Sequence, residues 1–324
     1  VGSEMCIRDS TYWVYIPDND AAGRPLILDL HGCTQQGPDV AYLSEMDAKA
    51  AQQGFTVVYP NQAAFSMTGT TTFDGNGSSC WNWFLPQGQA RGAGEPALLA
   101  GITETVAGSV QADPSRIDVL GVSAGGAMTD VLAATYPDIF AAASVLAGCE
   151  YKGLSCLGSA AALPPAVSGQ EAYQASTDAG GSHARVVPFL VENGDADTVV
   201  PVANAFEVVM QFQSMNDYAE HDGTAQYTVP STYCSDTFHA AAPPDTSANP
   251  PIVYNAYDVY TYTLDGSPCP SSGTAPGQLW IVHGEEHAWP GGPNLVVNPA
   301  SCCAKIYTNP GGPDITAASL QFFA

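Results

Sequence analysis

The sequence predicts an α/β fold in which helices flank a mainly parallel central sheet. Short apolar runs recur along the 324 residues, and helix-like segments separate them, which is the rhythm of repeated βαβ units. The run 186–191 is apolar almost throughout, as strands buried on both faces of a parallel sheet are. This length, with a hydrophobic content of 45%, is enough for a large buried core.

Seven aliphatic and aromatic runs are expected as strands, and five longer segments between or after them are expected as helices. The strands are expected at 12–16, 26–30, 55–59, 116–120, 142–146, 186–192 and 279–283. The helices are expected at 40–53, 95–110, 124–136, 202–215 and 315–323. Two regions break this rhythm, and we expect irregular excursions from the sheet at 154–184 and 216–275. The second excursion would form part of a substrate rim, or be a surface connection only.

The charge balance narrows the set of partners. Lys and Arg total 8 against 32 Asp and Glu, which gives a formal net charge of −24. Because such a field repels polyanions, neither nucleic acid nor an anionic membrane surface is expected as a partner. No apolar run is long enough to predict a membrane span. A monomer is assumed.

The cysteines favour disulfides over a metal site. The chain has nine, and none are spaced as a Cys-x-x-Cys pair, so a zinc site is not expected. No other metal and no cofactor are expected. Disulfides point to an oxidising compartment, and a secreted protein is expected. We expect Cys33 to pair with Cys80 and Cys149 with Cys156. Cys302 and Cys303 would either bridge each other or reach separate partners.

Residues 1–10 are expected to be a non-native segment. They include Cys6 and lack the apolar core of a signal peptide. Residues 11–324 are then expected to form a single catalytic domain.

The segment 119–125 (VLGVSAG) is the most informative stretch for function. An apolar run leads into Gly121-Val122-Ser123-Ala124-Gly125, and a helix-prone run follows. A serine between two glycines, after a strand and before a helix, is the pattern of a nucleophile elbow, in which side chains two positions away would clash. Ser123 is therefore the candidate nucleophile.

A serine hydroxyl needs a histidine base and a carboxylate that orients the base, and in α/β hydrolases these follow in the order serine, acid, histidine. Asp195 and Asp197 follow the expected strand 186–192, and we choose Asp197 as the catalytic acid. The other aspartate would shape a turn or cap the next helix. His287 follows the strand 279–283 in a loop rich in Gly and Pro and is the candidate base. His283 is expected as a packed or hydrogen-bonded residue.

The tetrahedral intermediate of acyl transfer requires backbone N–H donors. We expect one from Ala124 and one from Cys33, in the loop after strand 26–30. Gly32 would let this loop turn inward, and a Cys33–Cys80 disulfide would fix it. His31 is expected to hold the loop and not to act as a second base.

Taken together, these segments resemble extracellular polyhydroxybutyrate depolymerase-type esterases, a family with feruloyl and acetylxylan esterase relatives. The matching segments are 30–35 (LHGCTQ), 80–84 (CWNWF), 91–96 (RGAGEP), 121–128 (GVSAGGAM), 195–201 (DADTVVP) and 287–292 (HAWPGG). The resemblance implies an α/β-hydrolase fold and a triad of Ser123, Asp197 and His287.

The resemblance also implies roles for other residues. Trp289, Trp81 and Trp83 would contact substrate, although a Trp-x-Trp motif equally serves as a core anchor. Arg91 and Glu95 would form a structural ion pair. Where relatives carry small or apolar residues before the histidine, this chain has Glu285-Glu286, whose charges would move optimal activity toward alkaline pH.

The leading hypothesis is a secreted serine esterase that cleaves poly(3-hydroxybutyrate) or its oligomers through an acyl-enzyme, with aromatic polyesters such as poly(ethylene terephthalate) as an extension. A feruloyl or acetylxylan esterase acting on plant cell-wall polysaccharide is the alternative. A non-catalytic binding protein on a hydrolase scaffold is the alternative from another class.

Overall fold

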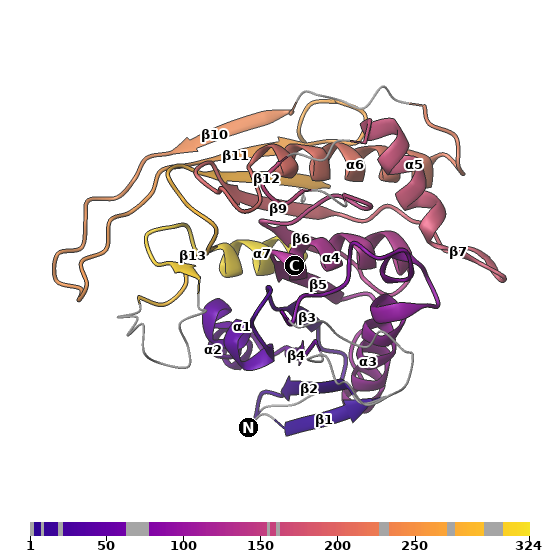
Figure 1. The fold of residues 1–324 in the computed structure, drawn as a ribbon, viewed down its shortest axis with the longest axis horizontal. Helices are drawn as coiled ribbons and strands as arrows, with labels where there is room; N and C mark the ends of the chain where they lie inside the picture. The colour runs from indigo at the N-terminus through magenta and orange to yellow at the C-terminus, as the bar shows by residue number, and fades with distance from the viewer. Residues whose placement is uncertain are drawn as a thin grey trace.

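A ten-stranded sheet runs through the centre of the computed structural model, which describes residues 3–7, 10–18, 22–62, 78–153, 156–159, 163–226, 233–270, 276–294 and 307–324 (Figure 1). The strand order is β1-β2-β4-β3-β5-β6-β9-β12-β11-β10. The strands are β1 (Ser3–Ile7), β2 (Ser10–Tyr15), β3 (Leu26–Leu30), β4 (Thr56–Pro60), β5 (Ile117–Val122), β6 (Ala143–Leu146), β9 (Phe189–Gly194), β10 (Ser235–His239), β11 (Tyr257–Tyr262) and β12 (Gly277–Val282).

The six central strands, from β4 to β12 in this order, are parallel. Strands β1 and β2 at one edge and β11 and β10 at the other are antiparallel to their neighbours. All seven expected strands are present: the strand at 26–30 has the expected bounds, and the ends of the others differ by at most three residues. The predicted fold class, a mainly parallel sheet flanked by helices, is confirmed.

Helices cover both faces of the sheet (Figure 1). On one face lie α3 (Gly94–Val110), α4 (Ala124–Thr135), α5 (Pro165–Ala175) and α6 (Ala203–Glu220), with the 3-10 helix η1 (Pro86–Gln89) beside α3. On the other face lie α1 (Gly37–Ser44), α2 (Met46–Gln53) and α7 (Ile315–Phe323).

The strand sequences explain this two-sided cover. In β3, Leu26, Leu28 and Leu30 pack into the core under α3 and α4, while Ile27 packs into the core under α1 and α2. Side chains alternate between the faces of a strand, so an apolar run of this kind is stable only when both faces are covered. Burying each of these aliphatic side chains contributes about 1.5–3 kcal/mol.

Local signals set the helix ends. The single helix expected at 40–53 is two helices, because Glu45 between them has a left-handed backbone with φ 50°. Gly54, with φ 79°, ends α2, as glycine does readily in that conformation. Asp314 caps α7, since its Oδ1 accepts a hydrogen bond from the Ala317 N–H at 2.9 Å.

The two expected excursions are more ordered than predicted. Region 154–184 contains α5 and a short hairpin of β7 (Thr177–Asp178) and β8 (Gly181–Ser182). Region 216–275 supplies β10 and β11, so it extends the main sheet, and its connection 240–256 projects to the left in Figure 1. In β11 most side chains are half-exposed, so no continuous apolar run marked this strand.

Disulfides link three pairs of cysteines among the described residues. Cys33–Cys80 and Cys149–Cys156 are both present, as expected, and Cys234–Cys269 links the start of β10 to the loop after β11. Cys302 and Cys303 lie outside the described residues. Strand β1 pairs with β2 in the sheet, and the expectation that residues 1–10 are non-native stays a prediction.

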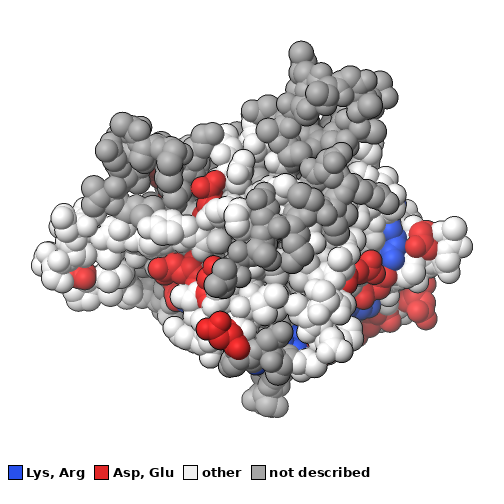
Figure 2. Space-filling model, turned by 90° about the horizontal axis from the view of Figure 1, so that it is seen from below, with Lys and Arg blue, Asp and Glu red and all other residues white. Residues whose placement is uncertain are grey.

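Within the described ranges, none of the helices combines the length and the apolar character needed to cross a bilayer. Acidic side chains form several groups on the face shown in Figure 2, where basic side chains are few.

Candidate active site

Ser123 lies on a sharp turn between β5 and α4. Its backbone has φ 59° and ψ −121°, a strained conformation that is uncommon for any residue but glycine. A Cβ on Gly125 would lie 2.1 Å from the Leu30 carbonyl oxygen, and one on Gly121 would lie 2.6 Å from the Gly125 backbone. Both glycines are therefore required by close backbone contact, as an elbow predicts.

Asp197 is held in the loop after β9, residues 195–201, which we call the acid loop. Its Oδ1 accepts hydrogen bonds from the N–H groups of Val199 and Val200, at 2.8 and 2.9 Å. Its Oδ2 lies 2.6 Å from Nδ1 of His287. The side chain is fully buried, so water does not compete for these contacts. A carboxylate in this position fixes the tautomer and direction of the imidazole.

Asp195 has a different partner. Its Oδ2 lies 2.8 Å from Nδ1 of His283, and its Oδ1 accepts the Gly284 N–H at 2.7 Å. His283 also contacts Asp258 of β11 at 3.1 Å, and the Asp195 hydrogen bond, with both negative charges, raises the pKa of His283. This pairing leaves Asp197 as the acid next to His287.

His287 lies in the loop after β12, residues 283–288, which we call the base loop. Beyond it, Trp289 starts β13 (Trp289–Pro290), which pairs with β14 (Thr308–Asn309). The Trp289 indole is fully buried and donates to Oγ1 of Thr316 in α7 at 3.1 Å. The base loop is thus anchored immediately after the histidine.

Ser123 and His287 meet in one cavity of about 230 Å³. Its walls come from the loop after β3, the elbow, the acid loop, the base loop and a few neighbours. The lining residues are Gly32, Cys33, Thr34, Gln35, Leu43, Val122, Ser123, Leu157, Val199, His287, Ala288 and Tyr307. The described residues include no hydrogen bond between Ser123 and His287, and catalytic contacts commonly tighten when substrate binds.

The loop after β3 reaches the same cavity through Gly32 and Cys33. The Gly32 N–H donates to Oε1 of Gln35 at 2.8 Å, and the Thr34 N–H donates to the Ser78 carbonyl at 2.6 Å. Among the described residues, the N–H groups of Cys33 and of Ala124, at the first turn of α4, have no such acceptor. The oxyanion role expected of these two donors from the sequence stays a prediction.

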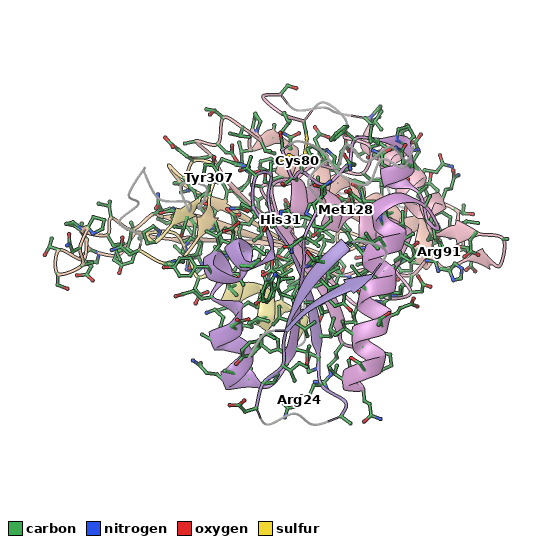
Figure 3. All side chains as sticks on the ribbon, turned by 60° about the horizontal axis from the view of Figure 1, so that its bottom comes forward. Arg24, His31, Cys80, Arg91, Met128 and Tyr307 are labelled. Atoms are coloured by element: carbon green, nitrogen blue, oxygen red, sulfur yellow. A yellow bond between two sulfur atoms is a disulfide. The ribbon has the colours of Figure 1, made fainter. Side chains whose placement is uncertain are left out.

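His31 supports this loop from inside the molecule (Figure 3). Its Nδ1 donates to the Gly32 carbonyl at 2.7 Å, and its Nε2 accepts the Gln62 N–H at 3.0 Å. Burial lowers the pKa of His31 to about 4, so the ring stays neutral. The Trp81 indole donates to the His31 carbonyl at 2.9 Å, and the Cys33–Cys80 disulfide closes the loop.

The three tryptophans expected to contact substrate are core residues instead. Exposed fractions are 1% for Trp81, 5% for Trp83 and 0% for Trp289, and none of the three lines the cavity. Trp81 anchors the loop after β3 and Trp289 anchors the base loop. The three tryptophans are close in sequence to residues of the site, but their rings face the packed interior.

The ion pair expected between Arg91 and Glu95 is absent. Arg91 binds Asp138 at 2.7 Å and Asp178 of the β7–β8 hairpin at 3.1 Å, at the edge of the molecule (Figure 3). Glu95 instead accepts hydrogen bonds from the Asn82 backbone and from the side-chain amides of Asn82 and Gln62. It therefore holds the segment around Trp81 and Trp83.

Glu285 differs from the sequence expectation as well. It is 2% exposed and faces Glu192 and Asn309, whereas Glu286 is exposed. Burial raises the pKa of Glu285 to about 8, so at neutral pH it keeps its proton. The expected pair of charges beside His287 is reduced to one, on Glu286.

Sequence reasoning missed the apolar rim of the cavity. Leu157, Val199 and Tyr307 line it and are 57%, 45% and 52% exposed. Val199 follows the acid in the same motif and could have been found from that spacing. Leu157 and Tyr307 are brought in from distant segments, and no local signal marks them. Within the described residues, no three His, Cys, Asp or Glu side chains form a metal-binding group.

Comparison with known proteins places these features in a family. The family model described as esterase PHB depolymerase matches residues 10–229. The chain is 36% identical to poly(3-hydroxyalkanoate) depolymerase C of Paucimonas lemoignei over 203 residues, which are 61% of this chain and 46% of that protein. It is 35% identical to feruloyl esterase B of Neurospora crassa over 155 residues, which are 47% of this chain and 48% of that protein.

A third relative is acetylxylan esterase A of Talaromyces purpureogenus, which is 30% identical over 64% of this chain and 53% of that protein. The chain thus spans about half the length of these curated relatives. Among solved structures, the acetyl xylan esterase from Aspergillus awamori superposes with a TM-score of 0.64 at 20% identity, over 89% of this chain and 94% of that one. This likeness shows the shared fold. The family model covers more than half of the sequence, and the chain belongs to the esterase PHB depolymerase family.

Proposed function

We propose that this chain is a serine esterase that hydrolyses carboxylic ester bonds through an acyl-enzyme on Ser123. The observation that carries the proposal is the convergence of the elbow serine and the Asp197-bound His287 in one cavity. Residues 11–324 would act as one catalytic domain, with no metal or cofactor. Three disulfides support a secreted location, because such bonds persist in oxidising compartments.

In the proposed reaction, Oγ of Ser123 attacks the ester carbonyl carbon while its proton passes to Nε2 of His287. The N–H groups of Cys33 and Ala124 bind the oxyanion. The intermediate then collapses, and the leaving alkoxide takes the proton from His287. Water attacks the acyl-enzyme by the same steps, which releases the acid and restores Ser123.

An aliphatic polyester such as poly(3-hydroxybutyrate), or its oligomers, is the substrate class we favour. The exposed Leu157, Val199 and Tyr307 give the cavity an apolar rim, which suits a chain of short hydroxyacyl units. The name of the Paucimonas relative points in the same direction.

Ser123→Ala tests the reaction class. The variant should lose hydrolysis of p-nitrophenyl butyrate by about 10⁴-fold or more, because no other nucleophile is in place. Its circular dichroism spectrum and melting temperature should match the wild type within error. Full activity in this folded variant would end the serine mechanism. A folded wild type without esterase activity would instead favour a non-catalytic role.

A feruloyl or acetylxylan esterase is the second candidate, since two of the relatives carry those names. Incubation with a poly(3-hydroxybutyrate) film, and separately with feruloylated and acetylated arabinoxylan, distinguishes the two. Clearing of the film without ferulate or acetate release supports the polyester. Release of ferulate or acetate with an intact film selects the polysaccharide ester.

A further inference from the structure

The cavity around Ser123 has two apolar walls. Leu157 and Val199 form one wall, and Leu43 and Tyr307 form the other. The side chains of Leu157, Val199 and Tyr307 are about half exposed, whereas Leu43 is buried. Exposed apolar side chains beside a nucleophile are available to the apolar part of a substrate, which gains affinity when it leaves water. Each wall is therefore a candidate subsite.

The wall of Leu157 and Val199 belongs to the face of the sheet that α4, α5 and α6 cover. Cys156, next to Leu157, and Val200, next to Val199, are both packed in the core on that face. The Gly158 N–H donates to the Val199 carbonyl at 2.8 Å, which joins the two segments directly. This wall is thus continuous with the acid loop.

Two anchors hold the segment 156–159 against the acid loop. The Asn204 side-chain amide, in the first turn of α6, donates to the carbonyls of Cys156 and Ser159, at 3.4 and 3.0 Å. The Cys149–Cys156 disulfide ties the same segment to the chain that follows β6. The position of the segment is therefore set both from α6 and from the end of β6.

Strand β6 also supports the elbow. The Ser123 N–H donates to the carbonyl of Leu146, the last residue of β6, at 2.9 Å. The chain that carries Cys149 thus holds the nucleophile as well as the disulfide. Leu157 consequently keeps its position relative to Ser123.

The wall of Leu43 and Tyr307 belongs to the opposite face of the sheet. Leu43 is on α1 and is packed in the core of that face. The Tyr307 carbonyl accepts the Trp289 N–H at 2.9 Å, and Trp289 belongs to the same core (Figure 3). A Cβ on Gly292 would lie 2.3 Å from Oγ1 of Thr308 and 2.9 Å from the Leu43 carbonyl. The chain beside Tyr307 therefore packs on the end of α1.

The two walls lie on different sides of the reacting atoms. Ser123 directly follows β5, a central strand, so it lies at the edge of the sheet between the two faces. The acyl and alcohol parts of an ester leave the carbonyl group in different directions. When one part extends over each face, each part contacts its own wall.

We propose that Leu157 with Val199, and Leu43 with Tyr307, are two separate subsites, which bind the apolar chains on the two sides of the scissile ester. The inference rests on the proposed esterase function and narrows its substrate class. An internal bond of an aliphatic polyester has an apolar chain on both sides and fills both subsites. An acetyl ester has only a methyl group on its acyl side and leaves one subsite empty.

The test compares two series of esters. The first varies the acyl chain, in p-nitrophenyl acetate, butyrate and hexanoate. The second varies the alcohol, in ethyl, butyl and hexyl butyrate, and the released acid is titrated at constant pH. In wild type, kcat/KM should increase with chain length in both series, because each added methylene group reaches an apolar wall.

The measured quantity is the ratio of kcat/KM for the longest ester of a series to that for the shortest. Leu157→Ala should lower this ratio about fivefold in one series only, because its wall meets one side of the ester. Tyr307→Ala should lower the ratio by a similar factor in the other series. Replacing Cys149 and Cys156 by Ser should lower it about twofold in the series that Leu157→Ala affects, since the wall loses an anchor but keeps its side chain.

Val167→Ala is the matched control. Val167 is an aliphatic residue on α5, on the same face of the sheet as Leu157, and is 42% exposed. It does not line the cavity. Both ratios of this variant should therefore equal those of wild type.

Unchanged ratios in folded Leu157→Ala and Tyr307→Ala would overturn the inference, and so would losses of both variants in the same series. A wild type whose kcat/KM does not increase with chain length in either series would overturn it too. In each case Ser123→Ala would still be inactive, and the esterase proposal would stand. Failure of the esterase proposal is seen separately, as full activity in Ser123→Ala. Circular dichroism confirms that each variant is folded.

Discussion

Each of the two aspartates in the acid loop has its own histidine. Asp197 binds Nδ1 of His287 at 2.6 Å inside the protein, whereas Asp195 binds Nδ1 of His283 at 2.8 Å near the surface. The two pairs have the same chemistry and are two residues apart in sequence. Only the first pair borders the cavity that contains Ser123.

This pairing predicts different effects for two identical substitutions. Asp197→Asn should lower kcat for p-nitrophenyl butyrate by about 10³–10⁴-fold, because an amide stabilises the wrong tautomer of the imidazole. Asp195→Asn is the matched control, and its kcat should stay within about threefold of the wild-type value. Comparable losses in both variants would mean that the acid loop as a whole, and not Asp197, orients the base.

The residue types of the proposed triad were predictable because each is marked locally. Ser123 is flanked by glycines, and Asp197 and His287 follow apolar strands. The roles of Trp81, Trp83 and Trp289 were not predictable, because the direction of an aromatic ring depends on the helices packed over it. Glu192 had a signal that went unused, an ionisable residue at the end of an apolar strand. Its neighbour Glu285 could be identified only in the folded structure.

At the scale of elements, the elbow depends on close packing of α4 against β3 and β5. Gly125→Ala should destabilise the protein by about 3 kcal/mol or more, since its Cβ would lie 2.1 Å from the Leu30 oxygen. Gly101→Ala in α3, where a Cβ meets nothing within 4 Å, should stabilise by about 0.5–1 kcal/mol. The free energy of unfolding from urea titration measures both. Equal effects would show that the elbow tolerates a side chain at 125.

The disulfides predict a second contrast between elements. Replacing Cys33 and Cys80 by Ser opens a link over 47 residues and should cost about 4 kcal/mol from chain entropy alone. Replacing Cys149 and Cys156, separated by 7 residues, should cost about 2 kcal/mol. Denaturant titration gives both values. The first variant should also have a lower kcat, because Cys33 is in the proposed oxyanion loop. An unchanged kcat would mean that the disulfide is not needed to hold this loop for catalysis.

The elements that the sequence did not predict share one physical feature. Strands β10 and β11 are at an antiparallel edge and are largely half-exposed or exposed, so they lack the apolar runs that marked the central parallel strands. The expected helix 40–53 is divided by a positive φ at Glu45, a residue type that gives no sequence signal for that conformation. The central strands, in contrast, were marked because both of their faces are buried.

At the scale of the whole molecule, many carboxyl groups are buried in a chain of net charge −24. Burial raises the pKa of Asp118 and Glu285 to about 8 and that of Glu150 to about 7. Between their ordinary pKa values and these, the unfolded chain has released the protons while the folded protein still holds them. Stability from these groups is therefore full at acidic pH and is lost as pH rises to about 8.

The melting temperature should consequently fall by about 5 °C or more between about pH 5 and about pH 8.5. Asp118→Asn should flatten part of this slope, because it removes one buried titrating group from β5. Differential scanning calorimetry at fixed ionic strength measures the effect. A melting temperature that is constant or rises over this range would show that the buried carboxyls ionise without cost.

The central claim is that His287 activates Ser123 as a nucleophile. Labelling with a fluorophosphonate probe, followed by mass mapping of the modified peptide, tests it most directly. We predict stoichiometric modification of wild type at Ser123, and loss of labelling in folded His287→Ala. Modification at another residue, no modification of folded wild type, or undiminished labelling of His287→Ala would contradict the claim.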